Sequence, residues 1–190
     1  MQLSNKAYEL IKSHFNNKHD KRLKHVEGVA KMAELLAIRY GIDPDIAKAC
    51  GYFHDYSKYD DYSEASKYLS QDEVAECEKY PFLYHAYLSA YHFKELISDD
   101  LDMFNAIYNH VFGRPNMSKL EEIIMIADFT EENREYDDCI RARKILLDGD
   151  MDKAIYESLK ATISIVEAKG ETPHPRQLAV FKEYEERIKK

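Results

Sequence analysis

Apolar side chains recur every three or four residues along most of the chain, which is the period of an amphipathic α-helix. In the segment 22–41, for example, Val29, Met32 and Leu36 lie on one stripe of the predicted helix. Runs that alternate apolar and polar residues, which would indicate strands, are absent, and there are only six glycines and five prolines. The pattern therefore predicts an all-α fold.

The ends of several predicted helices are marked by residues with known capping preferences. Gly41 is a suitable C-terminal stop, and Asp43 followed by Pro44 marks the start of the next helix. Ser118 and Glu121 have the spacing of a capping box. The predicted helices cover about residues 4–15, 22–41, 43–58, 82–96, 99–110, 119–132, 137–148 and 151–168, with short surface helices in 60–80 and a last helix after 173–175.

Length and composition predict one soluble domain. A chain of 190 residues suits a single core, so we expect one domain covering residues 1–190. The hydrophobic share of 45% and charged share of 33% are typical of globular proteins. No apolar run approaches the ~18 residues of a membrane span, and the amino-terminal segment lacks the features of a secretory signal. We therefore expect a cytoplasmic protein without a membrane partner.

The net charge and the cysteine content argue against some classes of partner and of metal site. A formal net charge of −8 argues against nucleic acid as a partner, so an anionic ligand would have to be held by a few local cations or by metal. The three cysteines, Cys50, Cys77 and Cys139, are far apart in sequence and predict neither a disulfide framework nor a zinc-thiolate site. The tyrosine-rich helical surface leaves room for a homodimer.

Six titratable residues fall within or at the ends of five different predicted helices: His25, His54, Asp55, His85, His110 and Asp128. Taken singly, a histidine on a partly apolar helical face is more often a hydrogen-bonded packing residue than a metal ligand. However, His25 is in line with Val29, and Asp128 is in line with Ile124, so both side chains are expected to point inward. Buried polar groups of this kind on several helices predict a shared cation.

The number and type of these residues indicate two metal ions. His54 can donate an imidazole nitrogen to one ion, and Asp55 can bridge that ion to a second one. Four histidines and two carboxylates exceed the ligands of a tetrahedral zinc and suit two octahedral ions such as iron or manganese. Two ions roughly 3.5 to 4 Å apart can activate a bridging hydroxide and hold a phosphoryl group. A continuing helical turn would bring Lys58 to the same side, where its ammonium would neutralise developing charge.

The H…HD…D pattern of these positions, together with the ADxxExxR run at 127–134, resembles the HD-domain metal-dependent phosphohydrolases. The similarity is to their YqeK-type branch, the symmetrical bis(5'-nucleosyl)-tetraphosphatases, and extends from about residue 18 over nearly the whole chain. The segments that carry it are RLKHVEGVA, HDYSK, PFLYHAYLSA, NHVFG, MSKLEEIIMIADFTEENR and HPRQLAVFKEY. The resemblance implies a single helical bundle with an HD core at about 18–135, C-terminal helices at about 137–190 and a metal centre between helices.

The resemblance also implies a ligand set and a reaction. One metal ion would be held by His25, His54, Asp55 and Asp128, and the other by Asp55, His85 and His110. Iron is the metal that the family favours, with manganese or another transition metal as the alternative. The implied reaction is hydrolysis of diadenosine tetraphosphate to two ADP by a hydroxide held between the metals, with Asp55 and Lys58 as catalytic residues and Lys58 also as a phosphate contact.

Two arginines are candidates for binding the substrate phosphates. Arg134 falls at the arginine of the ADxxExxR run, although an ion pair with Glu131 is a plainer interpretation. Arg114 lies in a predicted turn, where a solvated side chain is the plainer interpretation. Val111 stands where the family commonly has threonine, so a hydroxyl that could contact phosphate or order a water is missing.

Other functions stay open on the sequence alone. A related HD phosphohydrolase acting on a deoxynucleotide or a guanosine alarmone would share the metal ligands. A metal-binding and nucleotide-binding sensor with little turnover is favoured by the absence of the threonine at Val111. A structural helical domain with scattered histidines would bind no stoichiometric metal, and the matched spacing over the whole chain argues against it.

Overall fold

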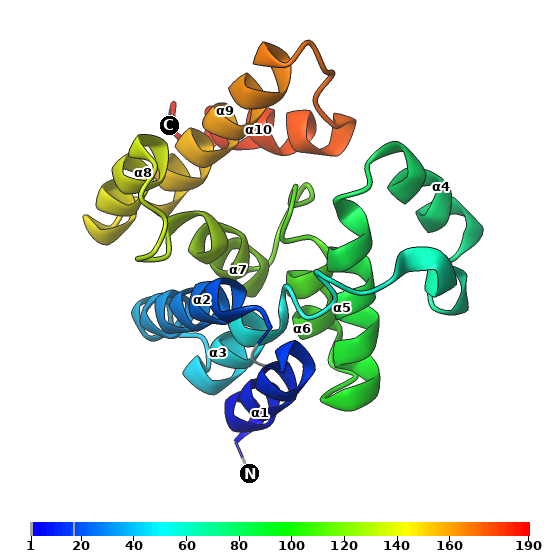
Figure 1. Cartoon of the computed structure of the whole chain (residues 1–190). Coiled ribbons are helices and arrows are strands. Elements are labelled where there is room, and N and C mark those ends of the chain that lie inside the picture. Colours follow the sequence, from blue (N-terminus) through cyan, green and yellow to red (C-terminus); the bar gives the residue numbers. More distant parts are fainter. Residues whose placement is uncertain (1, 17) are drawn as a thin grey trace.

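The backbone confirms the all-α prediction. The computed structural model describes residues 2–16 and 18–190, and these residues form ten α-helices and one short 3-10 helix, without a strand (Figure 1). The elements are α1 (Leu3–Phe15), α2 (Asp20–Tyr40), α3 (Pro44–Phe53), η1 (Tyr62–Lys67), α4 (Gln71–Lys79), α5 (Leu83–Leu96), α6 (Leu101–Tyr108), α7 (Lys119–Thr130), α8 (Asp137–Leu147), α9 (Met151–Ala168) and α10 (Pro175–Arg187).

The helices pack in two connected groups around α7. In one group, α2 packs on α3 and α7, α1 packs on α3, and α6 packs on α5 and α7. In the other, α8 packs on α9 and α9 on α10, and these helices lie at the top of Figure 1. η1 and α4 project to one side beyond α5, as the polar sequence of this stretch predicts (Figure 1). None of the described helices is long and apolar enough to cross a membrane.

The predicted helix caps are present. Gly41 adopts the left-handed conformation with φ 73°, and its N–H donates to the Ala37 carbonyl. The Asp43 side chain accepts a hydrogen bond from the Asp45 N–H at the start of α3. Ser118 and Glu121 form the capping box of α7. These local signals fix where α2 ends and where α3 and α7 begin.

Two helices end earlier than the sequence predicts. α3 ends at Phe53, and the following residues continue as successive turns in which Lys58 N–H donates to the Asp55 carbonyl over 3.0 Å. The expected continuing helical turn through Lys58 is therefore wrong. α6 ends at Tyr108, so His110 lies in a turn beyond the helix and does not close it. At both ends, a carbonyl of the last helical turn contacts the imidazole of a histidine in the candidate site.

The largest buried apolar cluster joins the two groups of helices. It extends from Ala7 on α1 through Phe53 and Ile123 to Tyr184 on α10. The Glu122 carboxylate on α7 also accepts hydrogen bonds from the Tyr184 hydroxyl at 2.6 Å and from Arg187 Nη1 at 2.7 Å. We propose from this shared core that residues 1–190 fold as one domain.

Replacing Glu122 by glutamine tests this link between α7 and α10. Burial raises the pKa of Glu122, but hydrogen bonds from Lys119, Tyr184 and Arg187 outweigh it and lower that pKa from 4.5. We expect Glu122→Gln to lower the free energy of unfolding by about 2 kcal/mol near pH 7, because charge-assisted hydrogen bonds are lost. A carboxylate with a lowered folded-state pKa stabilises the protein above its unfolded pKa, so the difference should vanish as the pH falls through the folded-state value.

The measurement is urea unfolding followed by circular dichroism across the acid range. Glu185→Gln is the matched control, because Glu185 pairs with Lys189 on the surface, and it should change the free energy by less than about 0.5 kcal/mol. One unfolding transition, shifted only by Glu122→Gln, is the expected result. Two separate transitions, or equal effects of the two variants, would contradict the single domain.

Candidate metal centre

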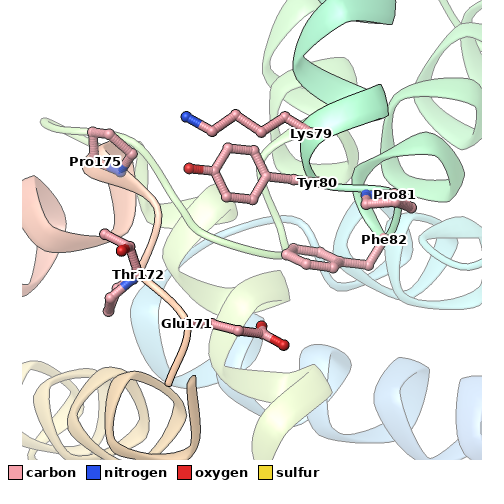
Figure 2. Close-up of a pocket in the computed structure, with 8 residues that line it drawn as sticks. Lys79, Tyr80, Pro81, Phe82, Glu171, Thr172 and Pro175 are labelled. Carbon is pink, nitrogen blue, oxygen red and sulfur yellow. The ribbon is translucent and has the colours of Figure 1, made fainter. Parts of the chain in front are cut away.

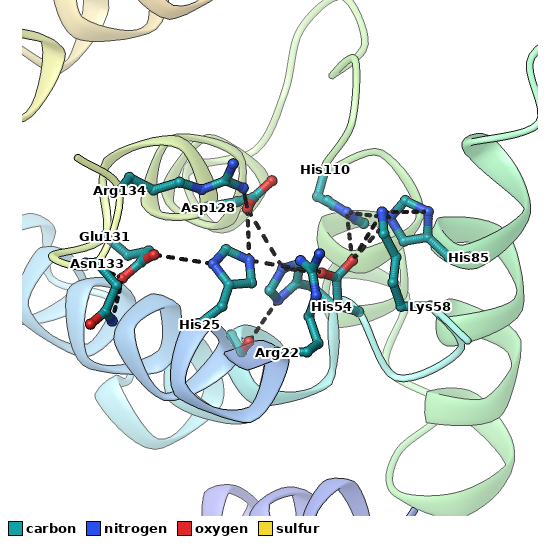
Figure 3. A network of polar contacts seen from close by, with 12 residues as sticks. Arg22, His25, His54, Lys58, His85, His110, Asp128, Glu131, Asn133 and Arg134 are labelled. Carbon is teal, nitrogen blue, oxygen red and sulfur yellow. Dashed lines mark hydrogen bonds and ion pairs between the residues drawn. The ribbon is translucent and has the colours of Figure 1, made fainter. Parts of the chain in front are cut away.

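Asp55 lies at the centre of the cluster formed by the predicted ligands. Its Oδ2 atom is 3.8 Å from His25 Nε2 and 3.6 Å from His54 Nε2. Its Oδ1 atom is 3.0 Å from His85 Nε2 and 3.9 Å from His110 Nε2. Each oxygen of the carboxylate therefore faces a different pair of imidazoles. Figure 3 shows the four histidines, which come from four separate parts of the chain.

Asp128, on α7, extends the cluster on the side of His25 and His54. Its Oδ1 atom is 3.1 Å from His25 Nε2 and 3.8 Å from His54 Nε2. Three overlapping groups have ligand atoms close enough to share an ion: His25, His54 and Asp55; His54, His110 and Asp128; and Asp55, His85 and His110. The structure thus brings all six predicted ligands together, and Asp55 belongs to two of the three groups.

The donor set fits divalent transition metals. Imidazole nitrogens and carboxylate oxygens are ligands that iron, manganese and zinc accept. Within the described residues, the buried His54 Nε2 atom has no hydrogen-bond partner, although His54 is fully shielded from solvent. Buried polar atoms are nearly always paired, so an unpaired nitrogen that faces two carboxylates is what a metal site requires.

The early ends of α3 and α6 fix two of these imidazoles. His54 Nδ1 lies 2.8 Å from the Gly51 carbonyl, and His110 Nδ1 lies 2.7 Å from the Ile107 carbonyl. Because a carbonyl only accepts, each Nδ1 must carry the hydrogen, which leaves Nε2 free to bind a metal. Each histidine uses a carbonyl three residues before it, in the last turn of the helix that has just ended.

The imidazole of His25 is also oriented through its Nδ1 atom, but the partner is a carboxylate and not a backbone carbonyl. Its Nδ1 atom is 3.2 Å from Glu131 Oε1, just beyond the end of α7 (Figure 3). Glu131 is buried and reaches α2 where Gly28 leaves space: a Cβ atom on Gly28 would lie 2.2 Å from Glu131 Oε2. Glycine at position 28 therefore permits the contact that orients His25.

A second glycine brings α3 close to α2. A Cβ atom on Gly51 would lie 2.7 Å from the Ala30 Cα atom, a distance that side chains do not tolerate. The absence of a side chain at Gly51 lets the two helices approach closely. This approach places His54, one turn after Gly51, near His25, and their ring centroids are 5.4 Å apart.

The electrostatic environment keeps the imidazoles and carboxylates in their metal-binding forms. Burial lowers the pKa of His54, His85 and His110, the last to about 4, so these rings are neutral near pH 7. Burial alone would raise the pKa of Asp55, but its imidazole neighbours and Lys58 lower it well below 3.8. The set thus offers neutral imidazoles around an ionised carboxylate.

His25 differs from the other three histidines. Burial lowers its pKa, but hydrogen bonds with Asp128 and Glu131 outweigh this effect and raise the pKa to about 9. Without metal, His25 therefore carries a proton that balances two carboxylates, and a bound cation would replace that proton.

Three cationic side chains surround the cluster. Arg22 Nη1 is 2.5 Å from Asp55 Oδ2, and Arg134 Nη2 is 2.8 Å from Asp128 Oδ1. Lys58 Nζ is 3.9 Å from Asp55 Oδ1 and 3.3 Å from the His85 ring nitrogens. These groups could neutralise the charge of an anionic ligand that binds at the centre.

The sequence analysis missed Arg22 and Glu131 as parts of the site. Arg22 lies three residues before His25, so helical spacing alone places both on one face of α2. Glu131 was considered only as an ion-pair partner of Arg134. That pairing is wrong, because Glu131 contacts His25 and Arg134 contacts Asp128.

Arg114 and Val111 lie near the cluster in sequence and have other contacts. Arg114 forms two hydrogen bonds of 2.7 Å with the buried Glu121, so it is not simply a solvated side chain. Its role as a phosphate contact stays a prediction. Val111 packs against the apolar cluster that includes Leu83 and Phe112.

A groove on the surface is lined by none of the predicted ligands. It has a volume of about 880 Å³ and lies between the start of α5 and the segment that joins α9 to α10. Figure 2 shows Tyr80 and Phe82 on one side of it and Glu171, Thr172 and Pro175 on the other. Phe82 also packs edge-on against Phe112, with ring centroids 5.4 Å apart.

Comparison with known proteins shows the family of the chain. The family model described as the HD domain matches residues 22–133. The chain belongs to the HD-domain family of hydrolases, and this class accounts for the all-α fold and for the histidine and aspartate cluster.

Individual relatives show which branch of the HD-domain family the chain belongs to. The chain is 35% identical to the symmetrical bis(5'-nucleosyl)-tetraphosphatase of Halalkalibacterium halodurans, over 93% of this chain and 94% of that protein. It is 32% identical to the protein of the same name in Bacillus subtilis, over 80% of this chain and 82% of that protein. Within the HD-domain family, it therefore belongs with the symmetrical bis(5'-nucleosyl)-tetraphosphatases.

A solved structure has the same fold. The crystal structure of a predicted HD superfamily hydrolase involved in NAD metabolism, from Clostridium acetobutylicum, superimposes with a TM-score of 0.83 at 33% sequence identity. The match covers 95% of this chain and 97% of that chain, so it includes the C-terminal helices as well as the HD domain.

Glu131 provides a test of how the centre is organised. We expect Glu131→Gln to weaken metal binding about 10- to 100-fold, because loss of the carboxylate that orients a ligand histidine has effects of this size. Glu132→Gln is the matched control, since Glu132 pairs with Lys31 on the surface. The measurement is competition for the metal with a chelator of known affinity. Equal affinities of the two variants would show that Glu131 does not orient His25.

Proposed function

We propose that the protein hydrolyses dinucleoside tetraphosphates, converting diadenosine tetraphosphate to two molecules of ADP. The observation that carries this proposal is the position of Asp55, whose two oxygens face two separate imidazole pairs and could join two cations. The names of the relatives support this substrate over a deoxynucleotide or an alarmone, and over a sensor with little turnover.

The proposed ligands divide into two sets that share Asp55. His25, His54, Asp55 and Asp128 would hold one divalent ion, and Asp55, His85 and His110 would hold the other. The ions, when bound, would lower the pKa of a coordinated water and neutralise charge on the phosphoryl group. The two oxygens of Asp55 support this division, because Oδ2 faces His25 and His54 whereas Oδ1 faces His85 and His110.

The residues around the ligands would bind and orient the tetraphosphate. Lys58, between Asp55 and His85, is the proposed catalytic cation that neutralises charge on the phosphorus under attack. Arg22 and Arg134, each paired with a carboxylate of the cluster, would hold the flanking phosphates. Arg114 is a more distant candidate, which would first have to leave Glu121. The departing ADP is already a stable anion, so no general acid is assigned.

The proposal also includes the metal, the kind of partner, the location in the cell and the oligomeric state. Iron is the proposed metal, with manganese or another transition metal as the alternative, because mixed imidazole and carboxylate sets accept all of them. The net charge of −8 supports a small nucleotide partner without nucleic acid. We also propose a cytoplasmic location and a homodimer, the latter from exposed apolar side chains such as Ile38 and Leu35 on one helix.

The first test is turnover of diadenosine tetraphosphate by iron-loaded protein in oxygen-18 water. We expect ADP as the sole nucleotide product, with one labelled oxygen for each molecule cleaved, because water attacks a central phosphorus. His54→Ala and Asp55→Ala should reduce turnover to the uncatalysed background. His14→Ala, which removes an imidazole paired with Asp60 outside the cluster, should retain turnover. ATP and AMP as products, or bound metal without any turnover, would contradict the proposal.

The role of Lys58 can be separated from metal binding. Lys58→Met should lower kcat about 10²- to 10³-fold, the usual effect of removing one group that stabilises transition-state charge, while the metal content stays at the wild-type value. Lys48→Met is the control, because Lys48 pairs with Glu34 away from the cluster. Metal analysis and steady-state kinetics on the same samples give both quantities. Loss of metal together with activity would assign Lys58 a structural role.

A further inference from the structure

Two stacked aromatic rings, His19 and Tyr59, lie beside the candidate metal centre. Their centroids are 3.8 Å apart and their planes differ by 15°. Phe15 packs edge-on against both, at 6.1 Å from the Tyr59 ring and 5.8 Å from the His19 ring. Tyr59 nevertheless has 52% of its surface exposed. Phe15 thus packs against both rings of the pair, and Tyr59 still presents aromatic surface to solvent.

Arg22 connects this pair to Asp55. The backbone N–H of Arg22 donates to the His19 carbonyl at 2.9 Å, so this arginine lies one turn after His19 at the start of α2. Its guanidinium contacts Asp55 Oδ2 at 2.5 Å. Lys58, the residue before Tyr59, reaches the other oxygen of Asp55. Tyr59 therefore directly follows one of the two cations that flank the shared carboxylate, and its stacking partner His19 lies one turn before the other.

Other tyrosines near the site are already engaged. Tyr108 stacks on Tyr87 with a centroid distance of 3.9 Å, and its hydroxyl donates to Glu73 at 2.8 Å. Tyr56 is half-buried and stacks on Phe53 in the core at 4.2 Å. Tyr59 differs from both because its ring is more than half exposed and the residue directly follows Lys58, a cation of the site.

We infer that His19 and Tyr59 form a stacking platform for a nucleobase, with Arg22 and Lys58 placed to bind the phosphates of the same nucleotide. The inference rests on the proposed function, since it assigns one end of the dinucleotide to a place on the protein. Base stacking on aromatic rings tolerates different bases, so the platform would position a nucleoside without requiring adenine.

The test compares two ligands that differ in having a base. Binding of ADP and of inorganic pyrophosphate to metal-loaded protein is measured by calorimetry. We expect Tyr59→Ala to raise the dissociation constant of ADP about tenfold and to leave that of pyrophosphate unchanged, because the loss of one stacked ring has about this effect. Tyr59→Phe keeps the ring and should keep the wild-type ratio of the two constants.

Two control variants test whether the effect on ADP binding depends on Tyr59 and not on another aromatic ring. Tyr156→Ala breaks the stack of Tyr156 on Phe181, which lies on α9 and α10, and should change neither constant. Phe82→Ala removes an exposed ring from the groove shown in Figure 2, the competing place for a base. A selective loss of ADP binding in Phe82→Ala, with Tyr59→Ala unaffected, would overturn the inference. Equal losses for ADP and pyrophosphate in Tyr59→Ala, or no ADP binding by the wild-type protein, would also overturn it.

Failure of the inference can be told apart from failure of the proposed function. Tyr59-dependent ADP binding without hydrolysis of diadenosine tetraphosphate would retain the platform and reject the hydrolase. Hydrolysis with the same KM in wild-type and Tyr59→Ala protein would retain the hydrolase and reject the platform. The two properties therefore have separate readouts.

Discussion

Asp55 is an ionised carboxylate in the interior of the protein, with only 2% of its surface exposed, and most of the site is arranged around it. Burial penalises its charge, so the chain must surround it with positive or hydrogen-bonding groups. The neighbours come from distant segments: Arg22 and His25 from α2, His85 from α5 and His110 from the turn after α6. Two cations, one at each oxygen of Asp55, would compensate the buried charge in the same way. The segments that the fold brings around Asp55 are therefore the segments that supply the proposed ligands.

The ends of helices decide how the imidazoles point. A helix that continued through His54 or His110 would use the carbonyls of Gly51 and Ile107 for its own backbone hydrogen bonds. Because α3 and α6 stop, the Gly51 carbonyl accepts from the Nδ1–H group of His54, and the Ile107 carbonyl accepts from that of His110 in addition to the His110 backbone N–H at 3.5 Å. The same termination turns the segment after Asp55 back, so that Lys58 approaches His85. The departure from helical geometry is therefore what gives the histidines their metal-binding orientation.

The sequence was sufficient to predict the class of the fold and the six residues that the fold brings together, because helical periodicity and residue type can be read locally. It predicted the caps at Gly41, Asp43 and Ser118 for the same reason. It did not predict the contact of Glu131 with His25, since that contact depends on the close approach of α7 to Gly28, which only the packed helices create. The early end of α3 was missed because no residue in HDYSK is a strong helix breaker, and tertiary contacts override a weak local preference.

The C-terminal helices, which carry no ligand, are tied to the centre through polar contacts. Arg176 at the start of α10 contacts Asn109 Oδ1 at 3.1 Å, and Asn109 Nδ2 donates to Glu121 at 3.0 Å. Asn109 immediately precedes His110, so the turn that presents this imidazole is held from two sides, by α7 and by α10. Since buried polar groups of this kind need all of their partners, α10 supports the geometry of the centre from outside the HD domain. This connection gives a physical reason why the similarity to the Clostridium acetobutylicum structure covers 95% of this chain and 97% of that chain and is not confined to the HD domain.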